Sequence, residues 1–258
     1  MRSWVLELWK YRELVMNLTR TYLLIKYRGS LLGFLWSLLN PLLMIAILSL
    51  AMRRIMNIEV ENYPFFLLVG LLPWNFFVTS VQSSTACVIS NGGLLQKVYF
   101  PREVFPLSTV AFFFVQFLLA TVVFGPFCLF WKNSFPWFTA LYPVLVILFL
   151  LFTLGVSLAV SAITVFYRDL QHFTEVALTA VFWLSPIVYF FEMIPEQHRF
   201  WFKLNPIVLY LTAFHDIIYW ERLPGTHTMI AVAAWPFVAL LAGVLIFRRL
   251  SPRFAEEI

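Results

Sequence analysis

Residues 90–103, with the sequence SNGGLLQKVYFPRE, form a polar and charged stretch between two long apolar runs. Leu94, Leu95 and Val98 lie about one helical turn apart, which would give a helix here one apolar face. A pair of glycines precedes these residues and a proline follows them, and both residue types interrupt helices. The stretch therefore predicts a short helix at the membrane surface between two spans, with an ordinary solvated loop as the alternative that spacing leaves open.

The composition of the rest of the chain excludes a water-soluble protein. Of its 258 residues, 62% are hydrophobic and 12% are charged, whereas an average soluble domain carries about 25% charged residues. The net charge of +5 does not indicate a nucleic-acid partner, because the basic residues stand beside apolar runs, where they set topology. Cys87 and Cys128 lie in or beside apolar runs, so neither a disulfide nor a metal site is expected.

Six apolar segments could cross a membrane as helices, which takes about 20 residues each. They are residues 34–52, 64–82, 104–131, 136–166, 176–190 and 228–247. The fifth is the shortest, and Phe191, Met193 and Ile194 could extend it. The expected fold is therefore an all-α membrane protein with six transmembrane helices.

The distribution of basic residues predicts the orientation of these spans. With the N-terminus inside, most of the Lys and Arg residues fall in cytoplasmic segments, in agreement with the positive-inside rule. Both termini and residues 90–103 are then cytoplasmic. Arg53 and Arg54 run against this assignment, because they would lie at an outer end. The charged residues before any long apolar run argue against a cleaved signal peptide.

Two segments outside the spans have the pattern of amphipathic helices. Leu14, Leu18 and Tyr22 follow helical spacing, which predicts a helix in the inner interface, with a simple basic anchor as the alternative. Residues 191–225 mix aromatic and charged side chains between prolines, which predicts short re-entrant or interfacial helices on the outer side. We therefore expect one transmembrane domain over residues 1–258, made of a cytoplasmic segment with the interface helix (1–30), five spans (34–190), outer helices (191–225), the last span (228–247) and a cytoplasmic tail (248–258).

The apolar segments lack the residues that ion-coupled carriers and membrane enzymes need. None of the six contains Asp, Glu, Lys, Arg or His, whereas ion coupling usually places such groups in the middle of the membrane. The chain has no glycine-rich phosphate-binding loop, and its four histidines lack metal-ligand spacing. No catalytic, cofactor-binding or metal-binding residue is therefore expected. The acidic residues Asp169, Glu175, Glu192 and Asp216 are expected in loops.

Aromatic and mildly polar side chains in the apolar segments could line a pathway. Aromatic faces pack on the C–H faces of sugar rings, and amide groups form hydrogen bonds with hydroxyls. The alternative is that Trp and Tyr collect at both membrane interfaces without regard to any substrate. The candidates for a channel lining are Trp36, Asn40, Trp74, Phe76, Phe77, Trp183 and Tyr189.

Seven short motifs, taken in order, resemble one known family. They are YRGSLLGFLW at 27–36 with an Asn-Pro pair at 40–41, GLLPWNFF at 70–77, the stretch 91–103, YRDL at 167–170, SPIVY at 185–189, IPE at 194–196 and LNP at 204–206. Together they are similar to the permease subunits of bacterial ABC exporters for polysaccharides, above all the O-antigen and teichoic-acid exporter permeases. The resemblance covers nearly the whole chain.

The resemblance implies a permease subunit of an ATP-driven exporter for a lipid-linked polysaccharide, such as the O-antigen of lipopolysaccharide biosynthesis, in the bacterial cytoplasmic (inner) membrane. It implies a homodimer with a second permease and two ATPase subunits on separate chains, which bind ATP and Mg²⁺. This chain would then be a transport subunit and not an enzyme. The polyprenyl-linked glycan would pass between the two permeases, through a channel lined chiefly by the first and fifth spans.

The resemblance also implies roles for particular segments. The helix before the first span would be an interfacial gate helix, with Tyr22, Lys26 and Arg28, and the helices at 191–225 would form an outer gate. The stretch that opens this section would be the coupling helix, which seats in a cleft of the ATPase. Its contact residues would be Asn91, Gly92, Leu94, Leu95, Lys97 and Tyr99.

Two other functions also fit the residues. One is an ABC exporter permease for another lipid or for a drug, which would share the topology. The other is a membrane enzyme acting on lipid-linked glycans, for which Arg199, His198 and His215 are the residues that could serve.

Overall fold

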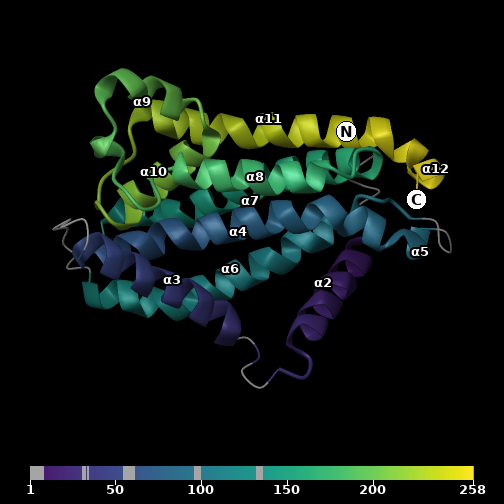
Figure 1. The fold of residues 1–258 in the computed structure, drawn as a ribbon, viewed down its shortest axis with the longest axis horizontal. Helices are drawn as coiled ribbons and strands as arrows, with labels where there is room; N and C mark the ends of the chain where they lie inside the picture. The colour runs from purple at the N-terminus through teal and green to yellow at the C-terminus, as the bar shows by residue number, and fades with distance from the viewer. Residues whose placement is uncertain are drawn as a thin grey trace.

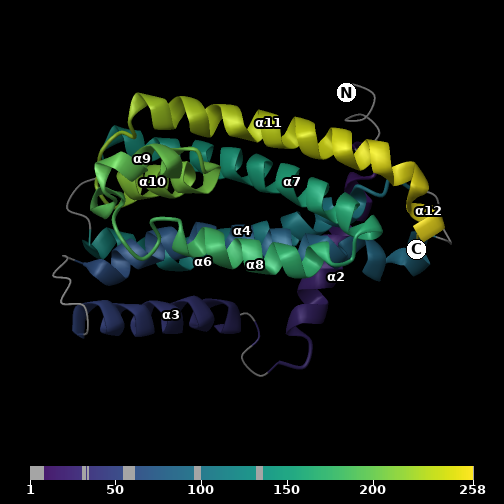
Figure 2. The ribbon, with the colours of Figure 1, turned by 45° about the horizontal axis from the view of Figure 1, so that its top comes forward.

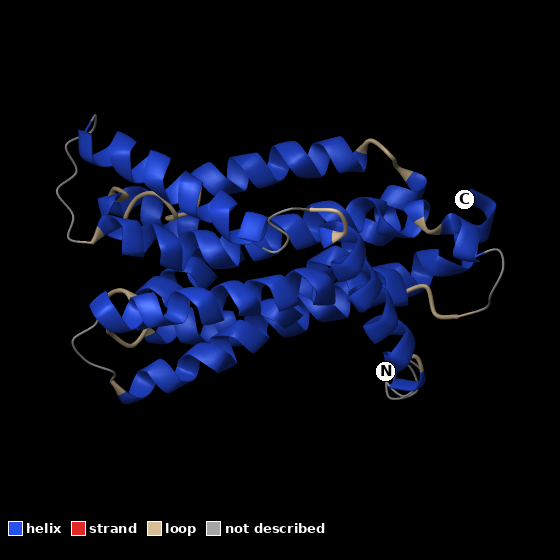
Figure 3. Ribbon diagram, turned by 90° about the horizontal axis from the view of Figure 1, so that it is seen from below, coloured by secondary structure: helices blue, strands red, loops and turns tan. Residues whose placement is uncertain are grey.

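The computed structural model describes residues 9–30, 33, 35–54, 62–95, 100–131 and 136–257. Over these residues the regular structure is helical, and no strand occurs (Figure 3). The α-helices are α2 (Arg12–Tyr27), α3 (Leu35–Arg54), α4 (Tyr63–Ser90), α5 (Gly92–Leu95), α6 (Val104–Trp131), α7 (Tyr142–Phe166), α8 (Leu170–Trp183), α9 (Glu196–Lys203), α10 (Pro206–Ile218), α11 (Thr226–Leu250) and α12 (Phe254–Glu257). Short 3-10 helices occur at Trp137–Leu141, Phe191–Met193 and Ser251–Arg253.

The long helices run between the same two ends of the molecule (Figures 1 and 2). α5, α12 and the turn that joins α7 to α8 lie at one end, whereas α9 and the first residues of α11 lie at the opposite end. α11 and α3 lie on opposite sides of the bundle in Figure 2, with the other long helices between them.

Within the described residues, five helical segments are long and apolar enough to cross a membrane. They are Leu35–Met52, Tyr63–Ser90, Val104–Pro126, Trp137–Phe166 and Thr226–Arg253. The fifth span expected from the sequence, residues 176–190, is not a continuous helix: α8 ends at Trp183, and an irregular segment follows. The physical reason is Pro186, which cannot donate a backbone hydrogen bond and disfavours helical geometry in Ser185 before it.

α4 lies at the centre of the molecule and contacts α3, α6, α7, α8 and α10. Its span is 72% buried, whereas the span in α3 is 22% buried. Phe76 and Phe77 of α4 are 3% and 5% exposed, and both rings pack on Phe149 of α7, with centroids 5.9 and 6.0 Å from that ring. Both rings therefore belong to the core of the chain, because neighbouring helices cover α4 on several sides.

α7 and α11 pack closely through glycines. A Cβ on Gly155 would lie 2.3 Å from the carbonyl carbon of Ala239, and a Cβ on Gly243 would lie 2.1 Å from the carbonyl oxygen of Gly155. Small residues allow helix backbones to approach in this way where lipid rather than water is the solvent. This contact leaves no room for a larger side chain at either glycine.

The two short helices expected within residues 191–225 are present as α9 and α10, and they differ in burial. α9 has no buried residue, and its Phe200 and Trp201 are exposed. α10 begins where the side chain of Asn205 accepts a hydrogen bond from the N–H of Ile207 at 3.0 Å, as an N-cap does. Most residues of α10 are buried, and the helix packs on α4, α7 and α11. Only α9 thus has the exposure that a surface helix requires.

Candidate functional site

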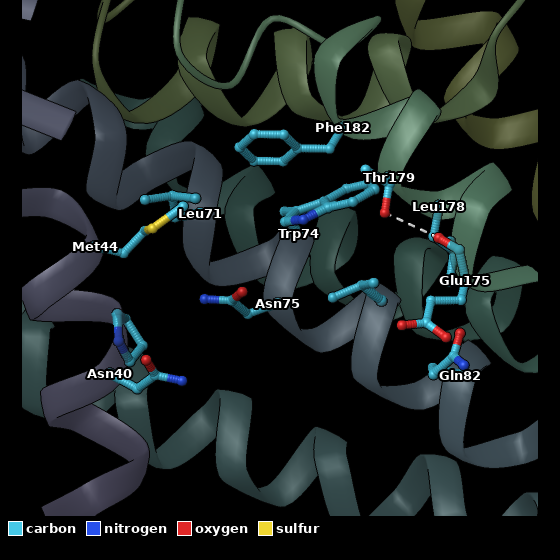
Figure 4. A pocket seen from close by; sticks show the side chains of 12 residues that line it. Asn40, Met44, Leu71, Trp74, Asn75, Gln82, Glu175, Leu178, Thr179 and Phe182 are labelled. Carbon is cyan, nitrogen blue, oxygen red and sulfur yellow. Dashed lines mark hydrogen bonds between the residues drawn. The ribbon is translucent and has the colours of Figure 1, made fainter. Parts of the chain in front are cut away.

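A cavity of about 490 Å³ lies between α3, α4 and α8 (Figure 4). Its volume falls within the range of about 300–1,000 Å³ that is usual for small-molecule sites. Amide, hydroxyl and carboxylate groups line it together with aromatic rings. The lining residues are Asn40, Pro41, Met44, Leu71, Trp74, Asn75, Val78, Gln82, Glu175, Leu178, Thr179 and Phe182.

Helical spacing in α4 and α8 brings these groups to one place. Glu175, Thr179 and Phe182 recur at the intervals that put side chains on one face of a helix, and so do Trp74 and Val78. The rings of Trp74 and Phe182 join the two helices across the cavity, with centroids 5.7 Å apart. The sequence pattern alone therefore predicts the face, although not the helix that it meets.

The polar groups lie at both ends of this cavity (Figure 4). Asn40 and Met44 of α3 lie at one end, and Gln82 and Glu175 lie at the other, with Asn75 between them. The oxygen Oε1 of Gln82 is buried and has no hydrogen-bond partner among the described residues. The cavity thus offers donors and acceptors along its length beside flat apolar surfaces.

A second cavity of about 280 Å³ lies between α2, α3, α4 and α6. It shares Asn40, Pro41 and Asn75 with the first, so the two cavities meet where α3 contacts α4. The remaining lining residues are Lys26, Trp36, Ser37, Leu72, Phe76, Thr79, Phe113, Gln116, Phe117 and Ala120.

Hydrogen bonds on Gln116 connect three helices at the second cavity. The ammonium of Lys26 in α2 donates to Oε1 of Gln116 in α6 at 2.7 Å, and the hydroxyl of Tyr27 donates to the same oxygen at 3.2 Å. The hydroxyls of Tyr27 and Ser37 in α3 are 2.8 Å apart. Burial lowers the pKa of Lys26, because a less hydrated site disfavours the charged ammonium. Lys26 therefore lies at the edge of a cavity with aromatic walls, where it is bonded to Gln116.

Two segments that the sequence assigned to different roles meet at Asn91. The amide Nδ2 of Asn91, directly before α5, donates to the carbonyl oxygen of Cys87 at 2.8 Å and to the hydroxyl of Tyr22 in α2 at 3.4 Å. Burial raises the pKa of Tyr22, and the hydrogen bond from Asn91 opposes that rise. The end of α4 is thereby tied to α2. Of the other residues predicted to have roles in these two segments, Gly92 is buried in α5, and Arg28 is exposed just after α2.

Part of the predicted coupling segment is outside the described residues. Lys97 and Tyr99 lie there, as do the side chains of Leu94 and Leu95, although the backbone of both leucines belongs to α5.

An ion-pair network lies near α9 and α10. Nε of Arg222 is 2.6 Å from Oδ1 of Asp216, and its Nη2 is 2.8 Å from Oε1 of Glu192. Burial raises the pKa of Asp216, and Arg222 limits that rise. Burial also acts to raise the pKa of Glu192, but the hydrogen bond from Arg222 and nearby groups lower it overall. Arg199 donates to the backbone oxygens of Ile194 and Glu192, each at 2.8 Å.

His215 is 3% exposed and stacks on Phe66 with ring centroids 4.0 Å apart. Its Nε2 lies 3.1 Å from the carbonyl oxygen of Phe66, and burial lowers its pKa to about 4. His198 is exposed on α9, and its ring contacts Gln197. His215 therefore contributes to the core, whereas Arg199 bonds backbone oxygens and pairs with Glu196, and His198 lies exposed on α9.

The predicted lining residues divide into three groups. Asn40 and Trp74 line the first cavity, and Trp36, Asn40 and Phe76 line the second. Trp183 is 61% exposed at the end of α8, where its carbonyl oxygen accepts a hydrogen bond from the hydroxyl of Tyr189 at 3.2 Å. Phe77 is in the core, as described above.

Sequence reasoning missed the polar residues on α8. Glu175 and Asp216 were expected in loops, but Glu175 belongs to α8 and Asp216 to α10. The expected span began at residue 176, one position after Glu175, because a charged residue was taken to mark the end of the apolar segment. The helical spacing of Glu175, Thr179 and Phe182 was the available signal.

The chain is similar to known transport proteins over most of its length. Residues 13–219 match the family described as ABC-2 type transporter. The chain is 37% identical to an O-antigen export system permease protein RfbA of Myxococcus xanthus, with 98% of each chain covered. It is 31% identical to an O-antigen export system permease protein RfbA of Klebsiella pneumoniae, with 95% of this chain and 94% of that protein covered. It is 24% identical to the polysialic acid transport protein KpsM of Escherichia coli, with 84% and 85% covered.

Proposed function

Because the chain belongs to the ABC-2 type transporter membrane family, we propose that it is the permease subunit of an ATP-driven exporter for a lipid-linked, O-antigen-like polysaccharide. The observation that carries the proposal is the cavity between α3, α4 and α8. Its amides, hydroxyl and aromatic rings suit sugar rings, in a chain whose relatives over almost its whole length are named for O-antigen export.

The proposed topology has six crossings of the bacterial cytoplasmic membrane. α8 lies beside α4 and α7 and is shorter than either (Figure 1). Its 14 residues rise only about 21 Å, less than the roughly 30 Å of the hydrocarbon core. We assign the remaining distance to the irregular residues 184–190. The positive-inside rule then places α5, α12 and both termini on the cytoplasmic side, with α9 outside.

The proposed assembly is a homodimer of permeases with two separate ATPase chains that bind ATP and Mg²⁺. Both helices that flank the first cavity expose large apolar side chains: Leu43 and Ile47 on α3 are 56% and 64% exposed, and Phe173 and Val176 on α8 are 68% and 69% exposed. A second permease facing α3 and α8 would cover part of this surface and close the cavity into a channel. The polyprenyl-linked glycan would pass between the two copies.

The contact between Asn91 and Tyr22 suggests how the ATPase could act on the channel. α5 would seat in the ATPase, and closure of two ATPases would move it. Because the end of α4 is tied to α2, the same motion would shift α2 and its contacts to α3 and α6. ATP favours export only if the nucleotide-bound ATPases bind the open permease more tightly than the closed one.

This function is tested by purifying the tagged chain from membranes with the candidate ATPase co-expressed. We expect two permeases with two ATPases, and export of a fluorescent polyprenyl-diphosphate glycan into vesicles that depends on ATP. Leu94→Glu should leave assembly of the permease intact and abolish ATP-driven export, because ATP hydrolysis is then uncoupled from the permease. The matched control is Leu223→Glu, at an exposed leucine between α10 and α11, which should export normally.

Two outcomes would contradict the proposal. The permease assignment fails if the chain purifies alone and binds no ATPase. The coupling assignment alone fails if Leu94→Glu and Leu223→Glu export equally well.

A further inference from the structure

Glu175 is the one ionisable residue among the described residues that line the α3–α4–α8 cavity. Its carboxylate points toward Gln82 at the end of the cavity that lies away from Asn40 (Figure 4). The hydroxyl of Thr179 donates a hydrogen bond to the backbone oxygen of Glu175 at 3.0 Å and not to its carboxylate. Within the described chain, no side chain forms an ion pair or a hydrogen bond with this carboxylate.

Glu175 lies within a helix that borders the cavity and not in a connecting loop. It comes a little more than one helical turn after α8 begins at Leu170, and Gln82 lies about two helical turns before α4 ends at Ser90. Charged side chains within the apolar helices of a membrane protein are costly and usually face water or a substrate path. Glu175 is exposed and belongs to the lining of the cavity.

The groups around the carboxylate suit a ligand rich in hydroxyls. A carboxylate only accepts hydrogen bonds, whereas each sugar hydroxyl can donate one. The Oε1 atom of Gln82 is a second buried acceptor without a partner in the described chain, and Asn75 adds an amide further along. The rings of Trp74 and Phe182 supply the flat apolar faces on which a sugar ring can pack.

The same groups disfavour an acidic ligand. A carboxylate on the sugar would bring two like charges together in the cavity, and like charges in close contact repel each other. The first cavity contains no basic side chain to offset this among the residues described. Lys26 lines the second cavity, and its ammonium is bonded to Gln116.

We propose that this cavity is a subsite for the sugar segment of an uncharged glycan, and that Glu175 selects against glycans with carboxylates in their repeat unit. The inference rests on the proposed function and names the substrate class of the same cavity. Glu175 acts here as a specificity residue, since it touches the passing sugar and takes part in no chemical step.

The test uses the complete exporter, with its ATPase, in proteoliposomes. Two fluorescent polyprenyl-diphosphate oligosaccharides are compared, which differ only in that one glucose is replaced by glucuronate. We expect the wild-type exporter to move the glucuronate probe at least about tenfold more slowly than the glucose probe, because like-charge contacts strongly oppose binding. Glu175→Gln keeps the size of the side chain and should reduce this difference to about twofold or less. Addition of salt should narrow the wild-type difference, because salt screens the repulsion between exposed charges.

The control variant is Glu196→Gln, which removes a carboxylate that is 89% exposed on α9 and remote from the cavity. It should keep the wild-type preference. Equal transport of both probes by the wild type, or an unchanged preference in Glu175→Gln, overturns the inference and leaves the proposed function standing. Failure of the wild type to move either probe in the presence of ATP overturns both. If Glu175→Gln fails to assemble, Glu175→Ala and the binding of each probe to the wild type, measured by fluorescence polarisation without ATP, decide the question in the same way.

Discussion

The α7–α11 contact and the α3–α4–α8 cavity are built from helices of the same kind and pack in opposite ways. Between α7 and α11, glycines bring backbones together until no side chain fits. Around the cavity, α3 is mostly exposed and leaves a space of about 490 Å³ beside α4. The difference teaches that one side of the molecule is a dense support, and that the other side, formed by α2, α3 and α8, leaves cavities between its helices.

The largest expected effect on stability comes from adding a side chain at the α7–α11 contact. Gly155→Leu should destabilise the folded chain by more than about 3 kcal/mol, because its Cβ alone would overlap the backbone of Ala239. Thermal unfolding in detergent, followed by size-exclusion chromatography, measures this loss. Gly125→Leu on α6 is the control, since a Cβ there meets nothing within 4 Å. If the two variants are equally stable, the close contact of α7 and α11 is wrong.

An intermediate effect on stability is expected when the pH is lowered, through His215 in α10. The folded pKa of His215 is lowered to about 4 by burial, so its stabilising contribution is fully present above the unfolded value of about 6.5 and is lost as pH falls toward 4. Between about pH 7 and pH 5 this loss should reach about 2 kcal/mol.

His215→Gln should flatten the decline in thermal stability with acid, measured by the same unfolding assay. Asp216 acts in the opposite sense, because its raised pKa favours the folded state at lower pH, and Glu192 has a lowered pKa and adds to the acid sensitivity. A decline that is equally steep in wild type and variant would show that His215 is not its source.

The smallest effect on stability is expected on the side formed by α2, α3 and α8. Lys26→Met removes the bond from α2 to Gln116 and should cost less than about 1 kcal/mol, because the side chain is exposed. Export should nevertheless fall several-fold, since α2 loses a link to α6. Arg20→Met, at an exposed position on the same helix, is the control for charge. Normal export by Lys26→Met would show that the contact between α2 and Gln116 is not needed for transport.

The sequence predicted the parts of this fold that depend on local pattern. Long apolar runs located the helices α3, α4, α6, α7 and α11, and prolines located the breaks around α9 and α10. The burial of a side chain depends on which neighbouring helix it faces, and the order of apolar residues along the sequence does not reveal that. Phe77 lies next to the lining residues Trp74 and Phe76 in sequence, yet it points into the core.

The sequence indicated some residues of the candidate site and not others. Asn40 and Trp74 stand out inside apolar runs, and both border the first cavity. Glu175 was missed because its charge ended the predicted span, and because Gln82, which borders the same cavity, belongs to α4, about 90 residues earlier in the chain. The contact between Tyr22 and Asn91 likewise joins segments that no periodicity links.

The glycine contact between α7 and α11 also bears on how the chain can change over time. A side chain at Gly155 or Gly243 would overlap the facing backbone, so we expect substitutions at either position to impair folding. The cavity wall has no such restriction, because Glu175, Gln82 and Thr179 border open space. A lineage could therefore adapt to a new glycan by single substitutions on α8 while the architecture that carries them stays constant.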